Sequence, residues 1–394
     1  MTVAVRPAPA WRLLLGIGAA TAAAHIGNNF STYLIGGLID RYGFSPAAMG
    51  AWSMAETLSY AAAMFVIAPR ATTVRPRGLA IWAGLLVVLA QAAGALGGGY
   101  ALLLLTRIGT GIGFGLANAA VNLAAGTTPH PARAISIGIT CQTLLYAAVN
   151  LVLPLVGSQG GVAGMFLALA ALSAVLTVAA SALPGRPVAA RDAAPLPPAR
   201  LGAAERRVLL AMALFTFGSL AIWPFMERAA HAIGISAVTF GRYQSAATLA
   251  SALGNVILAA IVGRIRGDVA VALALTACGA ACCALTLSHA AWAFAVALVA
   301  YNVAWFVSYP LLLGIAYRVD RSGRLPVLCS AVWLTMTSVG SLLTGIIAQV
   351  LGSYAPVGPL GLVFCLLAAA CAVPIAARAP APGPMLSAAR PRTG

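Results

Sequence analysis

Long apolar runs, separated by short polar interruptions, follow one another along almost the whole chain. A helix needs about 20 largely apolar residues to cross a bilayer, so the runs are delimited where Pro, Gly or charged residues break them. The pattern predicts twelve membrane-spanning helices. Their expected ranges are 11–38, 47–68, 78–96, 100–125, 134–156, 162–183, 208–230, 238–262, 269–287, 292–317, 325–351 and 358–376.

The composition agrees with a protein that lies in a membrane. The chain has 394 residues, of which 61% are hydrophobic and 8% charged, and its mean hydropathy is +0.96. A soluble globular protein of this size does not have such a composition. We therefore expect an all-α integral membrane protein, in contact with membrane lipid along its length.

The positions of the arginines predict how the chain is oriented. The formal net charge is +16, and the arginines lie in short loops between apolar runs. This placement is typical of the cytoplasmic loops of membrane proteins, which follow the positive-inside rule, and not of a nucleic-acid-binding surface. The loops on one side carry most of the arginines, whereas the opposite loops carry only Arg41 and Arg228. Both termini are therefore expected in the cytoplasm. All basic residues are arginine and alanine is abundant, which favours a multi-pass protein of a bacterial inner (plasma) membrane.

Two halves of the chain resemble each other at an offset of 191 residues. The offset aligns Gly43, Ser45, Gly50 and Arg133 with Gly234, Ser236, Gly241 and Arg324. We expect an N-terminal six-helix bundle (1–183), a cytoplasmic linker (184–206), a C-terminal six-helix bundle (207–379) and a cytoplasmic tail (380–394). Parallel repeats of this kind form a central site between the halves.

One arginine falls inside a predicted span. A charge at membrane depth costs at least about 2.5 kcal/mol, so Arg107 is expected to face a partner or a water-filled cavity. Glu56 lies at nearly the same depth, since at 1.5 Å per residue the two positions differ by about 3 Å. The pair is either a structural ion pair or a proton-coupling element in which protonated Glu56 releases Arg107.

The fourth predicted span carries a family motif. The sequence Arg107-Ile-Gly-Thr-Gly111 resembles the fourth-helix motif of the major facilitator superfamily (MFS), and the six-plus-six plan is similar to that family over essentially the whole length. The resemblance implies a secondary transporter with a rocker-switch cycle, and in the family this arginine is associated with proton coupling.

The chain also departs from the family pattern. The loop 69–78 has arginines but none of the acids of the usual Asp-Arg-x-Gly-Arg signature, and only a partial copy follows at 263–268. Asp40-Arg41-Tyr42-Gly43 imitates the signature on the opposite side of the membrane. The fifth span lacks the Gly-Pro pair that is usual in drug/proton antiporters, which makes a multidrug antiporter less favoured.

Further polar and aromatic positions are candidates for a substrate cavity. His25 is a candidate because an imidazole has an unperturbed pKa near 6.5 and so can exchange protons at physiological pH. The asparagines are candidates because polar groups at membrane depth need partners or water. A packing role is equally open for each of these residues. Glu227 and Arg228 are expected to form a structural or gating cluster near the outer surface, and Arg133 and Arg324 to anchor helices at the cytoplasmic surface. The expected cavity residues are His25, Asn28, Asn29, Phe114, Asn118, Trp223, Asn302 and Trp305.

We therefore expect a transporter of a small organic solute, with an organic anion favoured and protons as the coupling ion. An exporter of drugs or amphiphilic metabolites by proton antiport remains an alternative, as does a non-transporting membrane receptor. The sequence contains no clustered nucleophile, base or paired-carboxylate set, so an enzyme is not expected. The seven cysteines lie in apolar runs without zinc-like spacing, so no metal or cofactor is expected. A monomer is expected.

Overall fold

Every regular element in the described part of the chain is a helix. The computed structural model describes residues 10–70, 73–128, 131–186, 201–261, 265–320 and 324–378. Eight helices within these ranges are long and apolar enough to cross a membrane. The elements are α1 (Ala10–Tyr42), α2 (Pro46–Ile67), η1 (Ala68–Arg70), α3 (Pro76–Ala95), α4 (Tyr100–Gly126), α5 (Pro131–Ala180), α6 (Ala203–Leu220), η2 (Trp223–Phe225), α7 (Met226–His231), α8 (Ala237–Ile261), α9 (Gly267–Leu287), α10 (Ala291–Val319), α11 (Arg324–Leu351) and α12 (Val357–Arg378).

The expected span 134–156 and all but the last three residues of the expected span 162–183 lie within α5. The backbone of this long element leaves the helical region at Gly161, where φ is 60° and ψ is −162°. Only glycine adopts such a conformation readily. Gly161 therefore joins two helices across a kink, at the place where the sequence predicts a loop.

The expected span 208–230 lies within an apolar helical stretch, Ala203–His231, that is long enough to cross a membrane, although the helix is interrupted inside it. α6 ends at Leu220, a 3₁₀ turn follows, and α7 is a short helix of six residues. Pro224 lies in the 3₁₀ turn, and because proline lacks a backbone N–H it removes a hydrogen bond from a continuous α-helix. The break brings Trp223 and Glu227 toward α1.

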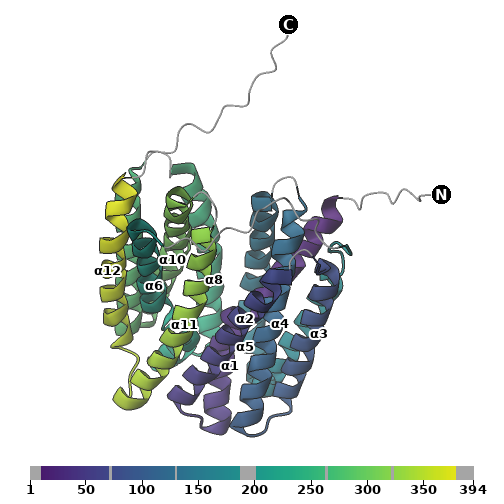
Figure 1. Cartoon of the computed structure of the whole chain (residues 1–394). Coiled ribbons are helices and arrows are strands. Elements are labelled where there is room, and N and C mark those ends of the chain that lie inside the picture. Colours follow the sequence, from purple (N-terminus) through teal and green to yellow (C-terminus); the bar gives the residue numbers. More distant parts are fainter. Residues whose placement is uncertain are drawn as a thin grey trace, which may run out of the picture.

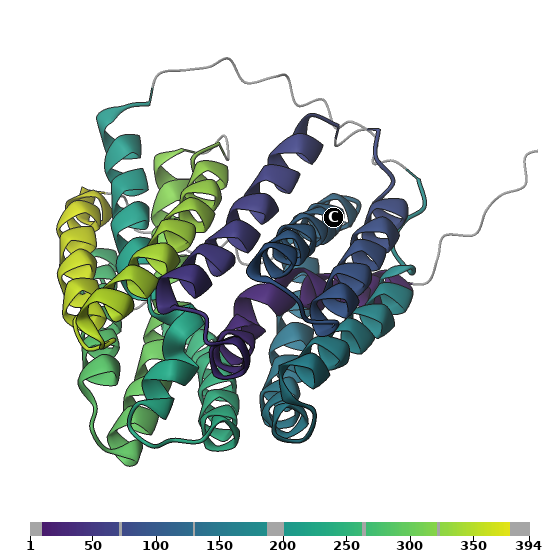
Figure 2. The same cartoon turned by 90° about the horizontal axis from the view of Figure 1, so that it is seen from below.

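The helices pack in two groups that meet along a shared interface (Figure 1). The first group is α1–α5, in which α1 packs on α5 and α2 on α4; the second is α6–α12, in which α9 packs on α10 and α12. Contacts between the groups run mainly through α2 with α11 and through α5 with α8. Seen from below, α2 and α11 lie side by side (Figure 2).

The two groups converge at one end of the molecule and diverge toward the other (Figure 1). We call the first end the joined end; α1 ends and α2 begins there. A Cβ on Gly50 of α2 would lie 2.7 Å from the Ser341 carbonyl oxygen and 3.0 Å from the Leu342 Cα of α11. Gly345 approaches the Pro46 backbone in the same way. Glycine allows these backbones to approach closely, as small residues do between membrane helices.

Two predicted segments lie largely or wholly beyond the described ranges. Most of the predicted linker 184–206 falls in the gap 187–200, and the predicted tail 380–394 falls entirely outside. Arg133 is exposed in the first turn of α5. Arg324 is the first residue of α11, and its side chain is outside the described part.

Candidate functional site

Arg107 of α4 and Glu56 of α2 form a buried ion pair. The Nη1 atom of Arg107 lies 2.7 Å from Oε2 of Glu56, and the two side chains are only 1% and 2% exposed. Thr110, one helical turn after Arg107, donates a hydrogen bond of 2.9 Å to the same carboxylate oxygen. The carboxylate is thus held from α4 by both a charge and a hydroxyl.

An aromatic ring covers the guanidinium. The Cζ of Arg107 lies 3.8 Å from the ring centroid of Trp52, a cation–π contact. The Trp52 indole donates a hydrogen bond of 3.0 Å to the Leu103 carbonyl, which fixes the ring beside α4. Among the described residues, no acceptor meets the guanidinium N–H groups in hydrogen-bond geometry, although the distance to Glu56 is that of an ion pair. The charge of Arg107 is therefore balanced by Glu56, whereas its guanidinium N–H groups remain available as hydrogen-bond donors.

α1 closes over this pair at a glycine. A side-chain carbon at Gly27 would collide with the Glu56 carboxylate and with the Phe114 ring. Phe114 is itself buried. The predicted residues Arg107, Glu56 and Phe114 therefore lie together between α1, α2 and α4, packed too closely for a solute in this conformation.

The predicted polar residues of α1 bond mostly within their own helix. His25 Nδ1 lies 2.9 Å from the Thr21 carbonyl, and because a carbonyl only accepts, Nδ1 carries the hydrogen. The Asn29 amide donates to the His25 carbonyl at 2.9 Å. Asn28 differs, because its backbone carbonyl accepts a hydrogen bond of 2.6 Å from the Trp223 indole of the second group. Asn28 and Trp223 thus link the two groups.

The predicted residues of α10 lie in the second group. Asn302 is buried; its amide donates 2.9 Å to the Leu298 carbonyl and its oxygen accepts from Gln244 at 3.4 Å. The ring of Trp305 is parallel to that of Tyr309, with centroids 5.5 Å apart and an interplanar angle of 6°. The described contacts do not join either Asn302 or Trp305 to Arg107.

Asn118, the remaining predicted cavity residue, is half-buried on α4. Its amide lies 3.4 Å from the Met64 sulfur of α2. Thioether sulfur is a weak acceptor, so this contact holds the amide only loosely.

Three residues near the pair were missing from the predicted set. Trp52 and Tyr60 flank Glu56 at four-residue spacing, and Thr110 follows Arg107 by three. Residues at these spacings share a helix face. That periodicity could have identified them, because whatever faces a buried charge is expected to contact it.

A second charged cluster joins the groups at the joined end. Arg228 of α7 makes a bidentate contact with Asp40 of α1, with nitrogen–oxygen distances of 2.7 and 2.8 Å. Its Nε donates 2.9 Å to Glu227, whose backbone N–H donates 2.9 Å to Thr32 of α1. We call Asp40, Glu227 and Arg228 the latch. Burial raises the pKa of the Tyr354 phenol in the nearby α11–α12 loop to about 12, so this neighbour stays neutral at physiological pH.

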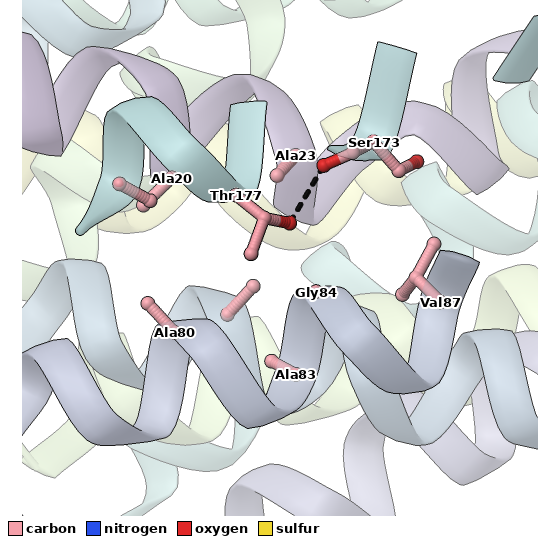
Figure 3. A pocket seen from close by; sticks show the side chains of 10 residues that line it. Ala20, Ala23, Ala80, Ala83, Gly84, Val87, Ser173 and Thr177 are labelled. Carbon is pink, nitrogen blue, oxygen red and sulfur yellow. Dashed lines mark hydrogen bonds between the residues drawn. The ribbon is translucent and has the colours of Figure 1, made fainter. Parts of the chain in front are cut away.

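A small cavity lies inside the first group rather than at the interface (Figure 3). Small residues of α1, α3 and α4 face Ser173 and Thr177 of α5, and the Thr177 hydroxyl donates to the Ser173 carbonyl. The space is on the order of a single water molecule. This cavity therefore cannot hold an organic solute.

Comparisons with known proteins agree on one family. The model of the Major Facilitator Superfamily matches residues 15–325. No curated protein sequence matches the chain significantly.

Several solved structures share the fold. The nucleoside transporter NupG is 12% identical, with 92% of this chain and 99% of that chain covered and a TM-score of 0.74. A D-xylose–proton symporter is 13% identical, with 91% and 96% covered and a TM-score of 0.71. A bacterial homologue of the human lysosomal transporter Spinster is 17% identical, with 94% and 98% covered and a TM-score of 0.69. Because the family model covers most of the chain and these folds agree along their whole length, the chain belongs to the Major Facilitator Superfamily, a family of membrane transporters.

Proposed function

We propose that the chain is a secondary active transporter that moves a small organic anion together with protons by alternating access. In this proposal the two helix groups are the two six-helix halves of a twelve-span protein, and both termini lie in the cytoplasm of a bacterium. The family membership and the fold support the class of function. The Arg107–Glu56 pair is the observation that carries the choice of substrate charge and coupling ion.

The charge balance of the buried pair supports coupling of anion and proton. Arg107 and ionised Glu56 together carry no net charge. If an organic monoanion bound to Arg107 while Glu56 stayed ionised, a net negative charge would be buried, which is costly away from water. Protonation of Glu56 removes that charge and frees Arg107 for the anion. Anion and proton therefore bind and leave together, which is symport.

The unused hydrogen-bonding capacity of Arg107 favours a carboxylate ligand. Guanidinium groups bind carboxylates bidentately through parallel N–H groups. In the present conformation no described acceptor occupies those N–H groups in hydrogen-bond geometry. Access requires α1 to move away at Gly27, where it packs against Glu56 and Phe114.

The joined end and the latch support an inward-open state. With the termini in the cytoplasm, the joined end faces outward, and the latch and the Gly50 contact close that side. The groups diverge toward the cytoplasm (Figure 1). Alternating access then opens the latch and brings the cytoplasmic ends together, and the solute shifts this equilibrium by its difference in affinity for the two states.

The test is uptake by purified protein in proteoliposomes. A panel of radiolabelled organic monocarboxylates is supplied with and without an acidic exterior, and a pH-sensitive dye inside reports proton entry. We expect accumulation only with the gradient, together with internal acidification. Uptake that ignores the gradient would refute proton coupling. Gradient-driven expulsion of amphiphiles would support the antiport alternative, and binding without movement would support a receptor.

Two variants test the pair itself. Glu56→Gln is expected to abolish gradient-driven accumulation while anion exchange without a gradient persists, because Arg107 keeps its charge. Arg107→Ala is expected to abolish both. Near-normal driven uptake in either variant would contradict the proposal.

Folding must be controlled, because removing one partner of a buried pair costs about 3–5 kcal/mol. The double variant Glu56→Gln/Arg107→Gln leaves no unpaired charge and should unfold close to the wild-type temperature while lacking transport. Glu205→Gln makes the same acid-to-amide change at the start of α6, where Glu205 accepts from the Gly202 N–H, and should transport normally.

A further inference from the structure

Three buried aromatic donor groups near the interface between the helix groups have no partner among the described residues. They are the Tyr60 hydroxyl of α2, the Trp305 indole N–H of α10 and the Trp333 indole N–H of α11. Buried polar groups in native proteins are nearly always hydrogen-bonded, and an unmet one is destabilising. Three unpaired donors close to one interface indicate that a ligand with hydrogen-bond acceptors binds them in another state of the protein.

The three side chains belong to one aromatic assembly. Tyr309 is parallel to Trp305 at 5.5 Å, and its ring lies 5.7 Å from that of Trp333 at an angle of 54°. Tyr60 of the first group lies on α2 and interacts electrostatically with Tyr309. α2 packs against α11, where the Thr57 and Ser338 hydroxyls are hydrogen-bonded at 2.5 Å. We call Tyr60, Trp305, Tyr309 and Trp333 the aromatic cluster. It spans α2, α10 and α11 and so crosses the interface between the two groups.

Tyr60 connects this cluster to the charge pair. It lies one helical turn after Glu56 and interacts with it electrostatically. Its own ring is fully buried, and its hydroxyl is unpaired in the described part of the protein. A ligand that accepts a hydrogen bond from Tyr60 therefore has its acceptor near Glu56 and the rest of its body among the rings.

The chemistry of the unpaired groups restricts the ligand. An indole N–H can only donate, so two of the three groups require an acceptor on the ligand and cannot bind an ammonium group. Flat rings at stacking distance favour a planar apolar body, since aromatic pairs gain about 0.5–1.5 kcal/mol beyond burial. The cluster thus combines acceptor recognition with selection for planarity.

We infer that the aromatic cluster binds a planar aromatic carboxylate, whose ring packs against Trp305, Tyr309 and Trp333 and whose oxygens accept hydrogen bonds from Tyr60 and the indoles. The inference rests on the proposed function, which supplies the anion, and adds the class of anion. Trp305 and Trp333 are specificity-determining residues in this assignment.

The test compares flat and saturated acids of equal charge. Binding of benzoate and naphthoate is measured by isothermal calorimetry on the purified full chain, against cyclohexanecarboxylate and decalin carboxylate. We expect the aromatic acid of each pair to bind at least about tenfold more tightly, and benzylamine not to compete.

Single substitutions identify the donors. Trp305→Phe and Trp333→Phe keep a ring but remove the N–H, so each should weaken benzoate and naphthoate about tenfold. Trp82→Phe and Trp292→Phe make the same change at indoles that are 72% and 74% exposed, and should leave binding unchanged. Both pairs are checked for the same unfolding temperature.

The possible outcomes separate this inference from the proposed function. Saturated acids that bind and accumulate as well as aromatic ones would overturn the inference and leave proton-coupled anion transport standing. Normal aromatic preference in both Trp305→Phe and Trp333→Phe would also overturn it, with the rings serving only in packing. Aromatic acids that bind through these indoles but never accumulate would support the site and refute the transport proposal.

Discussion

Gly50 is the position where a single methyl group should change the balance between conformations. It lies on α2 at the joined end, facing the backbone of α11. In Gly50→Ala the new Cβ would stand 2.7 Å from the Ser341 carbonyl oxygen and 3.0 Å from the Leu342 Cα. Both neighbours are backbone atoms, so no flexible side chain can turn aside. The helices must separate locally.

The cost follows from the distance. Ordinary van der Waals contact begins near 3.4 Å, so the Ser341 oxygen must move by about 0.7 Å from its 2.7 Å position. Overpacking a tightly fitted site costs about 1–3 kcal/mol. Because the proposed transport cycle separates the two groups at this end in the opposite conformation, the penalty should fall mainly on the state with the joined end closed. The ratio of closed to open molecules should therefore fall by about 5- to 150-fold.

Distances across the joined end report that ratio. Spin labels on Leu96→Cys in the α3–α4 loop and His289→Cys in the α9–α10 loop, in a background without the native cysteines, are attached at exposed positions of the first and second group. Double electron–electron resonance in lipid nanodiscs should show one short distance in the parent protein. Gly50→Ala should add a longer population.

Gly314→Ala is the matched control, because the Cβ at this α10 position would meet no atom within 4 Å. It should leave the distance distribution unchanged. A folded Gly50→Ala protein with the parent distribution would show that the α2–α11 approach does not hold the joined end shut, and would refute the reasoning.

Two further predictions concern the latch and the Trp52 ring that covers Arg107. The Asp40 side chain is 58% exposed and the Glu227 side chain 4%. Asp40→Asn should therefore weaken closure of the joined end by less than about 1 kcal/mol, and Glu227→Gln by about 1.5–3 kcal/mol. The same spin-label pair measures both variants, and equal effects would contradict the argument from burial. Trp52→Phe removes the hydrogen bond to Leu103 and weakens the cation–π contact with Arg107, so it should lower the free energy of unfolding in detergent by about 1–3 kcal/mol. Trp82→Phe, at an exposed indole, should lower it by about 0.5 kcal/mol or less. Equal stability of the two variants would show that the Trp52 ring contributes little.

The apolar runs were sufficient to predict an all-helical membrane protein, whereas its family was expected from the resemblance of the 107–111 motif and of the six-plus-six plan. Run length and hydropathy are properties of consecutive residues, so they are readable without tertiary structure. The two places where the helical backbone is interrupted each have a local cause. Gly161 forms a kink between two helices where the apolar pattern predicts a loop. The 3₁₀ turn at Pro224 inside the expected span 208–230 was not revealed by hydropathy, because its neighbours are apolar.

The candidate site was foreseeable only in part. Glu56 and Arg107 could be placed at similar depth because rise along a helix is regular, and Arg107 stood out because charges are rare in this chain. The role of the pair, and of the predicted cavity residues around it, stays a prediction. Tyr60, Trp52 and Thr110 share helix faces with the pair, which spacing could have indicated.

The contacts between the two helix groups were decided only by the tertiary structure. Asp40 looked like a misplaced copy of a loop motif, yet it binds Arg228, which is 188 positions away in the chain. The Trp223–Asn28 hydrogen bond and the packing of α2 on α11 likewise depend on how far each helix is tilted and rotated. When every face of a helix is apolar, the periodicity of the sequence does not show which face meets lipid and which meets another helix. Hydrophobicity thus determined that the chain enters the membrane as helices, whereas close packing at glycines and the pairing of a few buried polar groups decided how those helices meet.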